Sequence, residues 1–329
     1  MKHIIKQFVF IITMLFVFGI PQLNAETIVS LKKDDKTYQH ILQLTKDYYK
    51  AWSYKKEDAQ YDQPGKYYSK AAGLQFWDPL PPLGGHRGWQ EYQHVIEDVW
   101  LPNGIDAAAI LFSHDDSFHA WRHGDVIWTS ANCLVRAEYK DGSNATIPCR
   151  GSQVWQRQND HWLVVHEHFS TPIVPDGKLF QGQRDPKQSL KVNKAFTERA
   201  RAVAAQWQKG PIANIAKRLD GFYYKQDIHL YMPWPPHDGY TDWDSFDDAS
   251  TEYLSLFANT IKLTVNDDLE ATQHGDIAWT TATVTQEIEQ DNGNTLLVNG
   301  RQTLIWVIQD NQWLIAHEHL SFPLLPKEK

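Results

Sequence analysis

Apolar residues along the chain recur first at helical and then at strand-like spacing, and this order occurs twice. Helical spacing is found in residues 37–52 and 89–99, and again in residues 192–208 and 243–257. Each pair of helical stretches is followed by three or four segments rich in Val, Ile, Thr and Trp, which turn residues separate. The pattern therefore predicts an α+β fold with its helices first, present two times in one chain.

Two long motifs recur in the same order and at the same distance. H-G-D-V-I-W-T-S-A at residues 123–131 returns as H-G-D-I-A-W-T-T-A at 274–282, which is 151 residues later. W-L-V-V-H-E-H-F-S at 162–170 returns after the same interval as W-L-I-A-H-E-H-L-S at 313–321. A repeat of this length indicates duplication of a whole domain, and two copies make two globular domains rather than a solenoid.

A third motif helps to place the domain limits. F-W-D-P-L-P-P at residues 76–82 aligns with L-Y-M-P-W-P-P at 230–236, and its prolines exclude a helix interior or a central strand. We expect a first domain at 35–174, a linker at 175–191 and a second domain at 192–326.

The first 25 residues, 1–25, have the features of a secretory signal peptide. Lys2 and Lys6 supply positive charge, residues 8–20 form a nearly uninterrupted apolar run, and Ala25 is a small residue suited to cleavage. An uncleaved anchor is the alternative, although the run is shorter than the roughly 20 residues of a spanning helix. We expect a periplasmic or secreted protein with no membrane span after signal removal. The net charge of −8, without a basic stripe, argues against nucleic acid as a partner.

Turn chemistry predicts the register of one hairpin and, with it, a disulfide. Gly142 in K-D-G and Gly293 in D-N-G take the last position of a three-residue turn, where a positive φ is needed. A hairpin centred on Asp141 places Cys133 directly opposite Cys149, at a distance that a disulfide can bridge. An oxidising compartment would maintain such a bridge. Two buried free thiols are the alternative.

The order of elements and the repeated motifs resemble the SnoaL-like branch of the NTF2-like superfamily, which includes ketosteroid isomerase, scytalone dehydratase and polyketide cyclases. The resemblance rests on F-W-D-P-L-P-P, H-G-D-V-I-W-T-S-A, C-R-G-S-Q-V-W and W-L-V-V-H-E-H-F-S, each with its second-copy counterpart. It implies two tandem cone domains, each a curved antiparallel sheet packed on N-terminal helices around a pocket. Domains of this family commonly pair through their sheets. We therefore expect an intrachain pseudo-dimer, with further oligomerisation left open.

The histidines of each H-E-H motif share one face of the last strand, because alternate residues of a strand point the same way. His166 and His168, with His317 and His319, are candidates for binding a ligand oxygen, and His168 for a general base, since imidazole titrates near neutrality. A metal site would need a third ligand, and we predict none. A purely structural histidine, held by a backbone or carboxylate partner, is the alternative.

Two arginines are further candidates for ligand binding. In the predicted register Arg150 shares a strand face with Trp128, and Arg301 shares one with Trp279. A tryptophan, hydroxyls and one cation are typical of a pocket for an apolar molecule with a polar or anionic end. The alternative is an ion pair between each arginine and the glutamate of the nearby H-E-H motif. The N-D turn before the last strand can have two or three residues. Its length decides which sheet face the histidines take, because a one-residue slip in register moves every side chain of the strand to the other face.

Asp78 is a candidate catalytic base by resemblance. In the resembling enzymes a carboxylate at the pocket mouth acts as base, with apolar walls raising its pKa. The second copy has Met232 at the equivalent position, so that copy would lack this base. The alternative is that Asp78 merely starts a turn before Pro79.

Two functions remain open. The first is a binding module that holds a small apolar or amphipathic molecule in the cone pocket. The second is a cofactor-free isomerase, dehydratase or cyclase with Asp78 or His168 as base and Arg150 or Trp128 stabilising an oxyanion. No cofactor fingerprint is found, and we expect no cofactor. A single enclosed cavity containing Asp78 and His168 would favour the enzyme, whereas a cavity filled with Trp and Tyr would argue against the enzyme.

Overall fold

A computed structural model describes most of the chain. The described residues are 28–55, 62–71, 73–78, 82–100, 107–114, 117–139, 141–171, 194–208, 214–254, 258, 260–290 and 293–322. We call residues 28–171 domain 1 and residues 194–322 domain 2. The predicted signal peptide at 1–25 and the predicted linker at 175–191 lie outside the described residues.

Both domains begin with helices and end with long strands. Domain 1 contains β1 (Val29–Ser30), α2 (Lys36–Trp52), β2 (Tyr54–Lys55), α3 (Asp62–Gly65), β3 (Gln75–Trp77), β4 (His86–Arg87), α4 (Gly88–His94), the π-helix η2 (Val95–Trp100), β5 (Ala107–His114), β6 (His119–His123), β7 (Val126–Tyr139), β8 (Asn144–Gln158) and β9 (His161–Ser170). Domain 2 contains α6 (Lys194–Gln206), α7 (Ile215–Leu219), the 3-10 helix η4 (Asp220–Phe222), β10 (His229–Tyr231), α8 (Trp243–Leu254), β11 (Thr260–Val265), β12 (Glu270–His274), β13 (Ile277–Glu289), β14 (Thr295–Gln309) and β15 (Gln312–Ser321).

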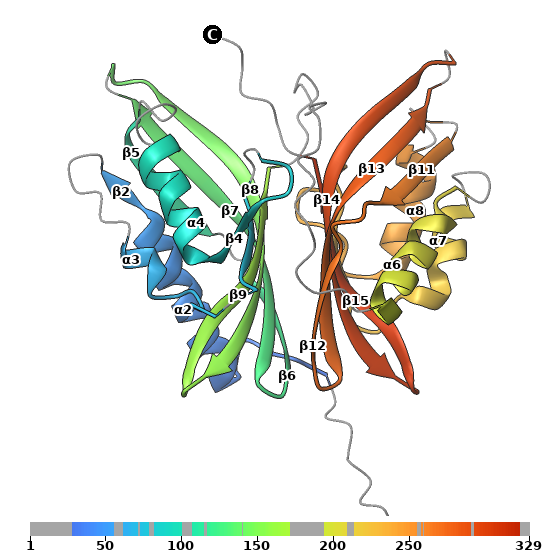
Figure 1. The fold of residues 1–329 in the computed structure, drawn as a ribbon, viewed down its shortest axis with the longest axis horizontal. Coiled ribbons are helices and arrows are strands. Elements are labelled where there is room, and N and C mark those ends of the chain that lie inside the picture. Colours follow the sequence, from blue (N-terminus) through green and yellow to red (C-terminus); the bar gives the residue numbers. More distant parts are fainter. Residues whose placement is uncertain are drawn as a thin grey trace, which may run out of the picture.

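Each domain is a curved sheet with helices on one face only. In both, the last strand lies between a long antiparallel neighbour and a short parallel strand: β9 between β8 and β3, and β15 between β14 and β10. The two sheets face each other across the middle of the molecule, and the helices cover the outer faces (Figure 1). The predicted α+β architecture is confirmed.

The hairpin register inferred from turn chemistry is also confirmed. Cys133 on β7 lies directly opposite Cys149 on β8, and both thiols are free and buried. Gly142 and Gly293 have positive φ, 84° and 79°, as the turn assignment requires.

In domain 1 the turn before the last strand has two residues, but a β-bulge further along that strand reverses the sheet face that the later side chains take. Asn159 and Asp160 both have positive φ, 47° and 64°, which is typical of a two-residue hairpin turn. The pairing then shifts between Trp155 and Val154, which leaves Val165 of β9 as the extra residue. Beyond this bulge, the face that each side chain takes is the opposite of the one that the turn alone would give.

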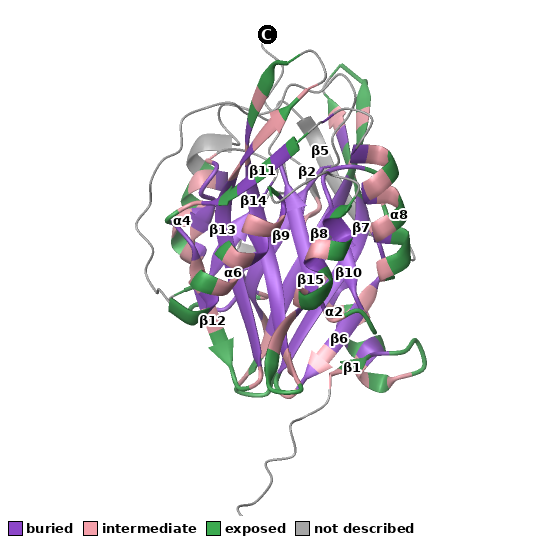
Figure 2. Cartoon of the chain, turned by 90° about the vertical axis from the view of Figure 1, so that its right-hand side faces the viewer, coloured by how far each residue is buried: buried purple, intermediate pink, exposed green. Residues whose placement is uncertain are grey.

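Three hydrophobic cores hold the structure together. One lies between the helices and the sheet of domain 1, and a second lies between the helices and the sheet of domain 2. The third lies between the two sheets and draws residues such as Trp128 and Val154 from domain 1 and Trp279 and Ile305 from domain 2. The buried strands run through the centre of the molecule, while exposed residues gather on the helices and hairpin ends (Figure 2). The inner sheet faces are therefore a domain interface.

Candidate functional site

The histidines of the two H-E-H motifs meet between the sheets. The rings of His168 and His319 are stacked, with centroids 3.7 Å apart and planes 7° from parallel. His168 Nδ1 is hydrogen-bonded to Thr303 at 3.0 Å and its Nε2 to Ser321 at 2.7 Å. These partners come from the opposite domain, so both ring nitrogens of His168 are hydrogen-bonded across the interface.

A two-fold relation repeats this pattern in the other direction. His319 Nδ1 is hydrogen-bonded to Ser152 at 2.9 Å and its Nε2 to Ser170 at 2.7 Å. The outer histidines complete the pattern: His166 Nε2 lies 2.8 Å from the Thr303 hydroxyl, and His317 Nε2 lies 2.9 Å from that of Ser152. Each histidine is thus bound to a hydroxyl of the other sheet.

These imidazoles are neutral at physiological pH. Burial lowers the pKa of His166 to about 3 and that of His317 to about 4. Burial, together with the neighbouring His166 and Arg301, also places the pKa of His168 well below its usual range. Burial and the adjacent His168 do the same for the pKa of His319. A neutral ring carries one donor and one acceptor nitrogen, which suits the paired hydroxyl contacts.

The two arginines also cross the interface. Arg150 donates to the carbonyl of Met232 at 2.7 Å. Arg301 donates to the carbonyls of Leu83 at 2.9 Å and Pro82 at 2.7 Å, and to that of Asp78. Each guanidinium thus binds the Pro-rich segment of the opposite domain.

Both guanidinium groups are buried and charged. Burial lowers the pKa of Arg150 and of Arg301 to about 10, which still leaves each charged at neutral pH. The alternative that Arg150 pairs with Glu167 is wrong, because the bulge turns Glu167 to the opposite face of the sheet.

Trp128 and Trp279 lie on the same inner faces as the arginines and histidines. Their side chains therefore lie between the sheets and not inside the cones, where the sequence places a pocket. A part in ligand binding stays a prediction for Trp128, Arg150, His166, Trp279, Arg301, His317 and His319, as does a catalytic part for His168.

Inside the cone of domain 1, Glu167 is the centre of a buried polar cluster, and it was not among the predicted site residues. The Tyr48 hydroxyl donates to its carboxyl, the Tyr68 hydroxyl lies 3.4 Å from it, and Gln153 Nε2 donates to it at 3.1 Å. The two tyrosine hydroxyls are 2.6 Å apart, and Trp52 Nε1 donates to that of Tyr68 at 3.2 Å. Burial raises the pKa of Glu167 to about 7, and hydrogen bonds from Tyr48 and Gln153 limit the rise.

Domain 2 retains only part of this cluster. Glu318 receives hydrogen bonds from Tyr223 and, at 2.7 Å, from Gln302, and burial raises its pKa. The difference comes from the first helix: α2 buries Thr45, Tyr48 and Tyr49, whereas the equivalent turns of α6 bury Ala200, Val203 and Ala204. The cone of domain 1 is therefore the more polar of the two.

Asp78 also belongs to the cone side of domain 1. Its carboxylate lies 3.5 Å from Nε2 of the buried His86, whose ring stacks on Tyr92 at 5.4 Å. His168 instead packs on Trp77, on the inner face of the sheet. Asp78 and His168 therefore do not share a cavity.

Aromatic rings line the rest of this cone. Tyr68 stacks on Trp89 at 5.2 Å, and Phe76 stacks on Tyr92 at 4.3 Å. Trp52 packs against Tyr92 at 5.6 Å. The cluster around Glu167 thus lies behind apolar walls. One sequence feature pointed to it: the glutamate of H-E-H must face away from its two histidines.

Metal and membrane features were sought in the described ranges only. There, no group of three or more His, Cys, Asp or Glu side chains converges in a way that could hold a metal ion. No helix in that part of the chain has both the length and the hydrophobicity to cross a membrane.

Many solved structures are similar to part of this chain, and the three described next are distant from it in sequence. An NTF2-like protein of unknown function from Pseudomonas putida KT2440 is 19% identical, over 45% of this chain and 96% of that one, with a TM-score of 0.35. An NTF2-like superfamily protein from Salmonella enterica is 18% identical over 41% and 92%, with a TM-score of 0.33. The association domain of C. elegans CaMKII is 18% identical over 41% and 95%, with a TM-score of 0.31.

No curated protein matches the chain significantly. The SnoaL-like domain family, by contrast, matches it twice, over residues 86–174 and 201–325. These two matches together span more than half of the sequence and fall one in each domain. The chain belongs to the SnoaL-like domain family, with two copies of the domain in tandem.

Proposed function

We propose that this protein is an exported binding protein, in which the cone of domain 1 holds a small amphipathic molecule and domain 2 is its structural partner in an intrachain pseudo-dimer. The observation that carries the proposal is the unequal distribution of buried polar groups between the cones. Three polar side chains of α2 face the core of domain 1 where domain 2 has only alanine and valine.

The arrangement around Glu167 fits a ligand with one polar end. A fully buried carboxyl loses its hydration, so it weakens the fold unless it has partners or a function. Its hydrogen-bonded neighbour Tyr48 and the hydroxyl of Thr45, which has no partner among the described residues, add donors and acceptors nearby. The surrounding aromatic walls match an apolar body.

The alternative is a cofactor-free isomerase, dehydratase or cyclase in the same cone. It is favoured by the pKa of Glu167, which burial raises to about 7, because a general acid or base works best when its pKa is near the ambient pH. Asp78, next to His86, is a second acid–base group in domain 1. We prefer binding because Asp78 and His168 lie on opposite faces of the sheet, and because His168 has both ring nitrogens occupied at the interface.

Thermal unfolding of the chain lacking residues 1–25, measured with a panel of phenols, cyclic ketones and amphipathic carboxylic acids, tests the proposal. Glu167→Gln and Glu318→Gln are a matched pair, because the two residues hold equivalent places in the two cones. We expect a ligand that raises the melting temperature of the wild type and of Glu318→Gln but not of Glu167→Gln. Failure of every compound, or equal loss in both variants, contradicts the proposal. Turnover of a bound ketone that Glu167→Gln abolishes would favour the enzyme.

Export and oxidation belong to the same proposal. We infer that cleavage after Ala25 releases the protein into the periplasm or the medium, where Cys133 and Cys149 form a disulfide. The support is the sequence of the first 25 residues and the direct cross-strand pairing of the two cysteines. Thiol alkylation of protein from the exported fraction, before and after reduction, tests the disulfide. Two thiols that are alkylated without reduction argue against it.

A further inference from the structure

The interface between the sheets has two ends that the two-fold relation makes equivalent. Among the described residues, large side chains fill one end but not the other. At the filled end, Trp121 of β6 lies opposite Trp128 of β7, and their rings stack at 5.8 Å and 8°. At the other end, β12 and β13 pair in the same register, with Thr272 opposite Trp279. Trp279 therefore lacks the indole partner that Trp128 has.

The domain facing each tryptophan also contributes a large residue at the filled end and a small one at the other end. Tyr224 donates its backbone N–H to Ile315 at 2.8 Å, and Ser69 donates its own to Val164 at 2.9 Å, so Tyr224 and Ser69 are structural equivalents. Tyr224 packs on the apolar cluster between the sheets at the filled end. The other end has the small, polar Ser69 in its place.

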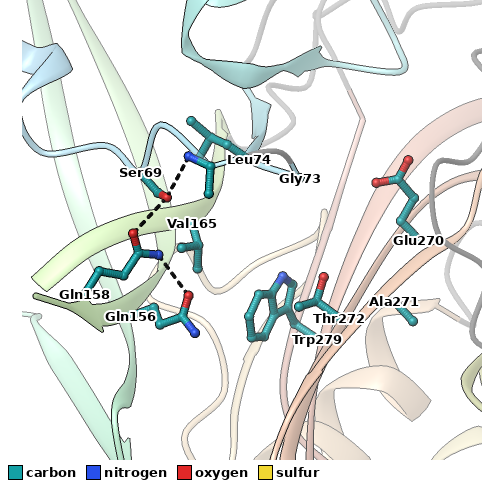
Figure 3. A pocket seen from close by; sticks show the side chains of 11 residues that line it. Ser69, Gly73, Leu74, Gln156, Gln158, Val165, Glu270, Ala271, Thr272 and Trp279 are labelled. Atoms are coloured by element: carbon teal, nitrogen blue, oxygen red, sulfur yellow. Dashed lines mark hydrogen bonds between the residues drawn. The ribbon is translucent and has the colours of Figure 1, made fainter.

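These substitutions open a groove of about 140 Å³ between the domains. Domain 1 lines it with Ser69, Leu74, Gln156 and Gln158, and domain 2 with Thr272 and Trp279 among others. Figure 3 shows the indole of Trp279 beside Thr272, across the groove from the polar side chains of Ser69, Gln156 and Gln158.

Those polar side chains form a connected row. Ser69 Oγ donates to Gln158 Oε1 at 3.2 Å, and Gln158 Nε2 donates to Gln156 Oε1 at 3.0 Å. Gln156 Nε2 lies 3.3 Å from the ring nitrogen of His274. An amide has two donors and two acceptor sites, so this row keeps capacity for a further partner at the edge of the groove.

We propose that the groove binds a small planar nitrogen heterocycle, of indole or purine size, which stacks on Trp279 as Trp121 stacks on Trp128. The ring takes the volume that Thr272 leaves open, and its N–H donates to a side-chain amide oxygen of Gln156 or Gln158. A heterocycle that also has an unprotonated ring nitrogen accepts a second hydrogen bond from an amide N–H of the same pair. The filled end of the interface shows that this position accommodates an indole. The site is separate from the cone that contains Glu167.

Calorimetric titration of the wild-type chain with indole tests the proposal. We expect one binding site, with an affinity that Thr272→Trp lowers at least tenfold because the new indole occupies the groove. Thr272→Trp should also melt at or above the wild-type temperature, since it restores the stack of the filled end. Ser69→Tyr fills the groove from the other wall and provides the same test in an independent background.

Two controls separate this site from the cone. Glu167→Gln should leave the affinity for indole unchanged, and Trp121→Thr should add a second site by opening the filled end. The proposal is overturned if indole does not bind the wild type, or if Thr272→Trp and Ser69→Tyr bind indole as tightly as the wild type does. Loss of indole binding in Glu167→Gln alone would also overturn it, because that result places indole in the cone.

Discussion

Replacing Glu167 by Gln should change how the stability of the protein depends on pH. In the folded state, burial raises the pKa of Glu167 from its ordinary value of 4.5 to about 7. The native state therefore keeps a proton that the unfolded chain has already released. Stability from this group is fully present below pH 4.5 and is lost as the pH rises towards 7. Glutamine does not titrate, so this loss should be missing in the variant.

The size of the effect follows from the two pKa values. One pKa unit corresponds to about 1.4 kcal/mol, so the difference between 4.5 and about 7 is worth about 3 kcal/mol, most of it between pH 5 and pH 8. The interface histidines act in the opposite direction, because burial lowers their pKa values and stability falls as they protonate in the unfolded chain. Comparison of wild type with variant cancels that contribution.

Urea unfolding at pH 5, 6, 7 and 8, followed by tryptophan fluorescence, measures this effect. The wild type should lose about 2.5 kcal/mol more than Glu167→Gln as the pH rises from 5 to 8. Glu198→Gln, on the exposed side of α6, controls for the removal of one carboxylate. Parallel curves for wild type and Glu167→Gln would refute the reasoning, because they would mean that the native carboxyl is already ionised at pH 5.

Three further results are expected. Arg301→Met should cost about 3 kcal/mol of unfolding free energy and Arg150→Met about 1, because the former leaves three buried carbonyls without their donor and the latter leaves one; equal costs in urea unfolding would contradict this. His168→Ala should cost about 2–4 kcal/mol, since it removes two interdomain hydrogen bonds and a ring stack, and a fall below 1 kcal/mol would argue against a structural role. In reducing buffer, Cys133 and Cys149 should react with a thiol reagent only on unfolding, because both are buried and burial raises the pKa of Cys133; rapid labelling of the native protein would contradict this.

Local rules were enough to predict the fold and one hairpin in detail. The 3.6-residue spacing placed a helix at residues 37–52, and the structure has α2 at Lys36–Trp52. A glycine with positive φ at position 142 fixed the pairing of Cys133 with Cys149. These features depend on residues that are close in sequence, so a single sequence contains the necessary information.

The site was harder to predict because one extra residue in the last strand decides which side chains face the cone and which face the other domain. With the two-residue turn alone, Ser152 would lie opposite Glu167, and Arg150 would share that face. The bulge at Val165 places Ser152 opposite His168 instead and sends the carboxyl into the cone. In domain 2 the pairing of β14 with β15 shifts in the same way and leaves Ala316 as the extra residue. Neither Val165 nor Ala316 has a side chain that marks a bulge, so the faces follow from tertiary packing. The interdomain partners of the H-E-H histidines lie more than 130 residues away in the sequence and depend on how the sheets dock.

Joining both halves of a symmetric pair in one polypeptide has a consequence for how the molecule can evolve. In a dimer of identical subunits, every substitution appears at both two-fold positions, so a residue needed for chemistry also disturbs its twin. Here Asp78 and Met232 occupy twin positions, and each offers its backbone carbonyl to the arginine of the other half. Because each of these two carbonyl contacts uses a main-chain atom, neither depends on which side chain stands there, and the twin positions can carry a carboxylate in one half and a thioether in the other.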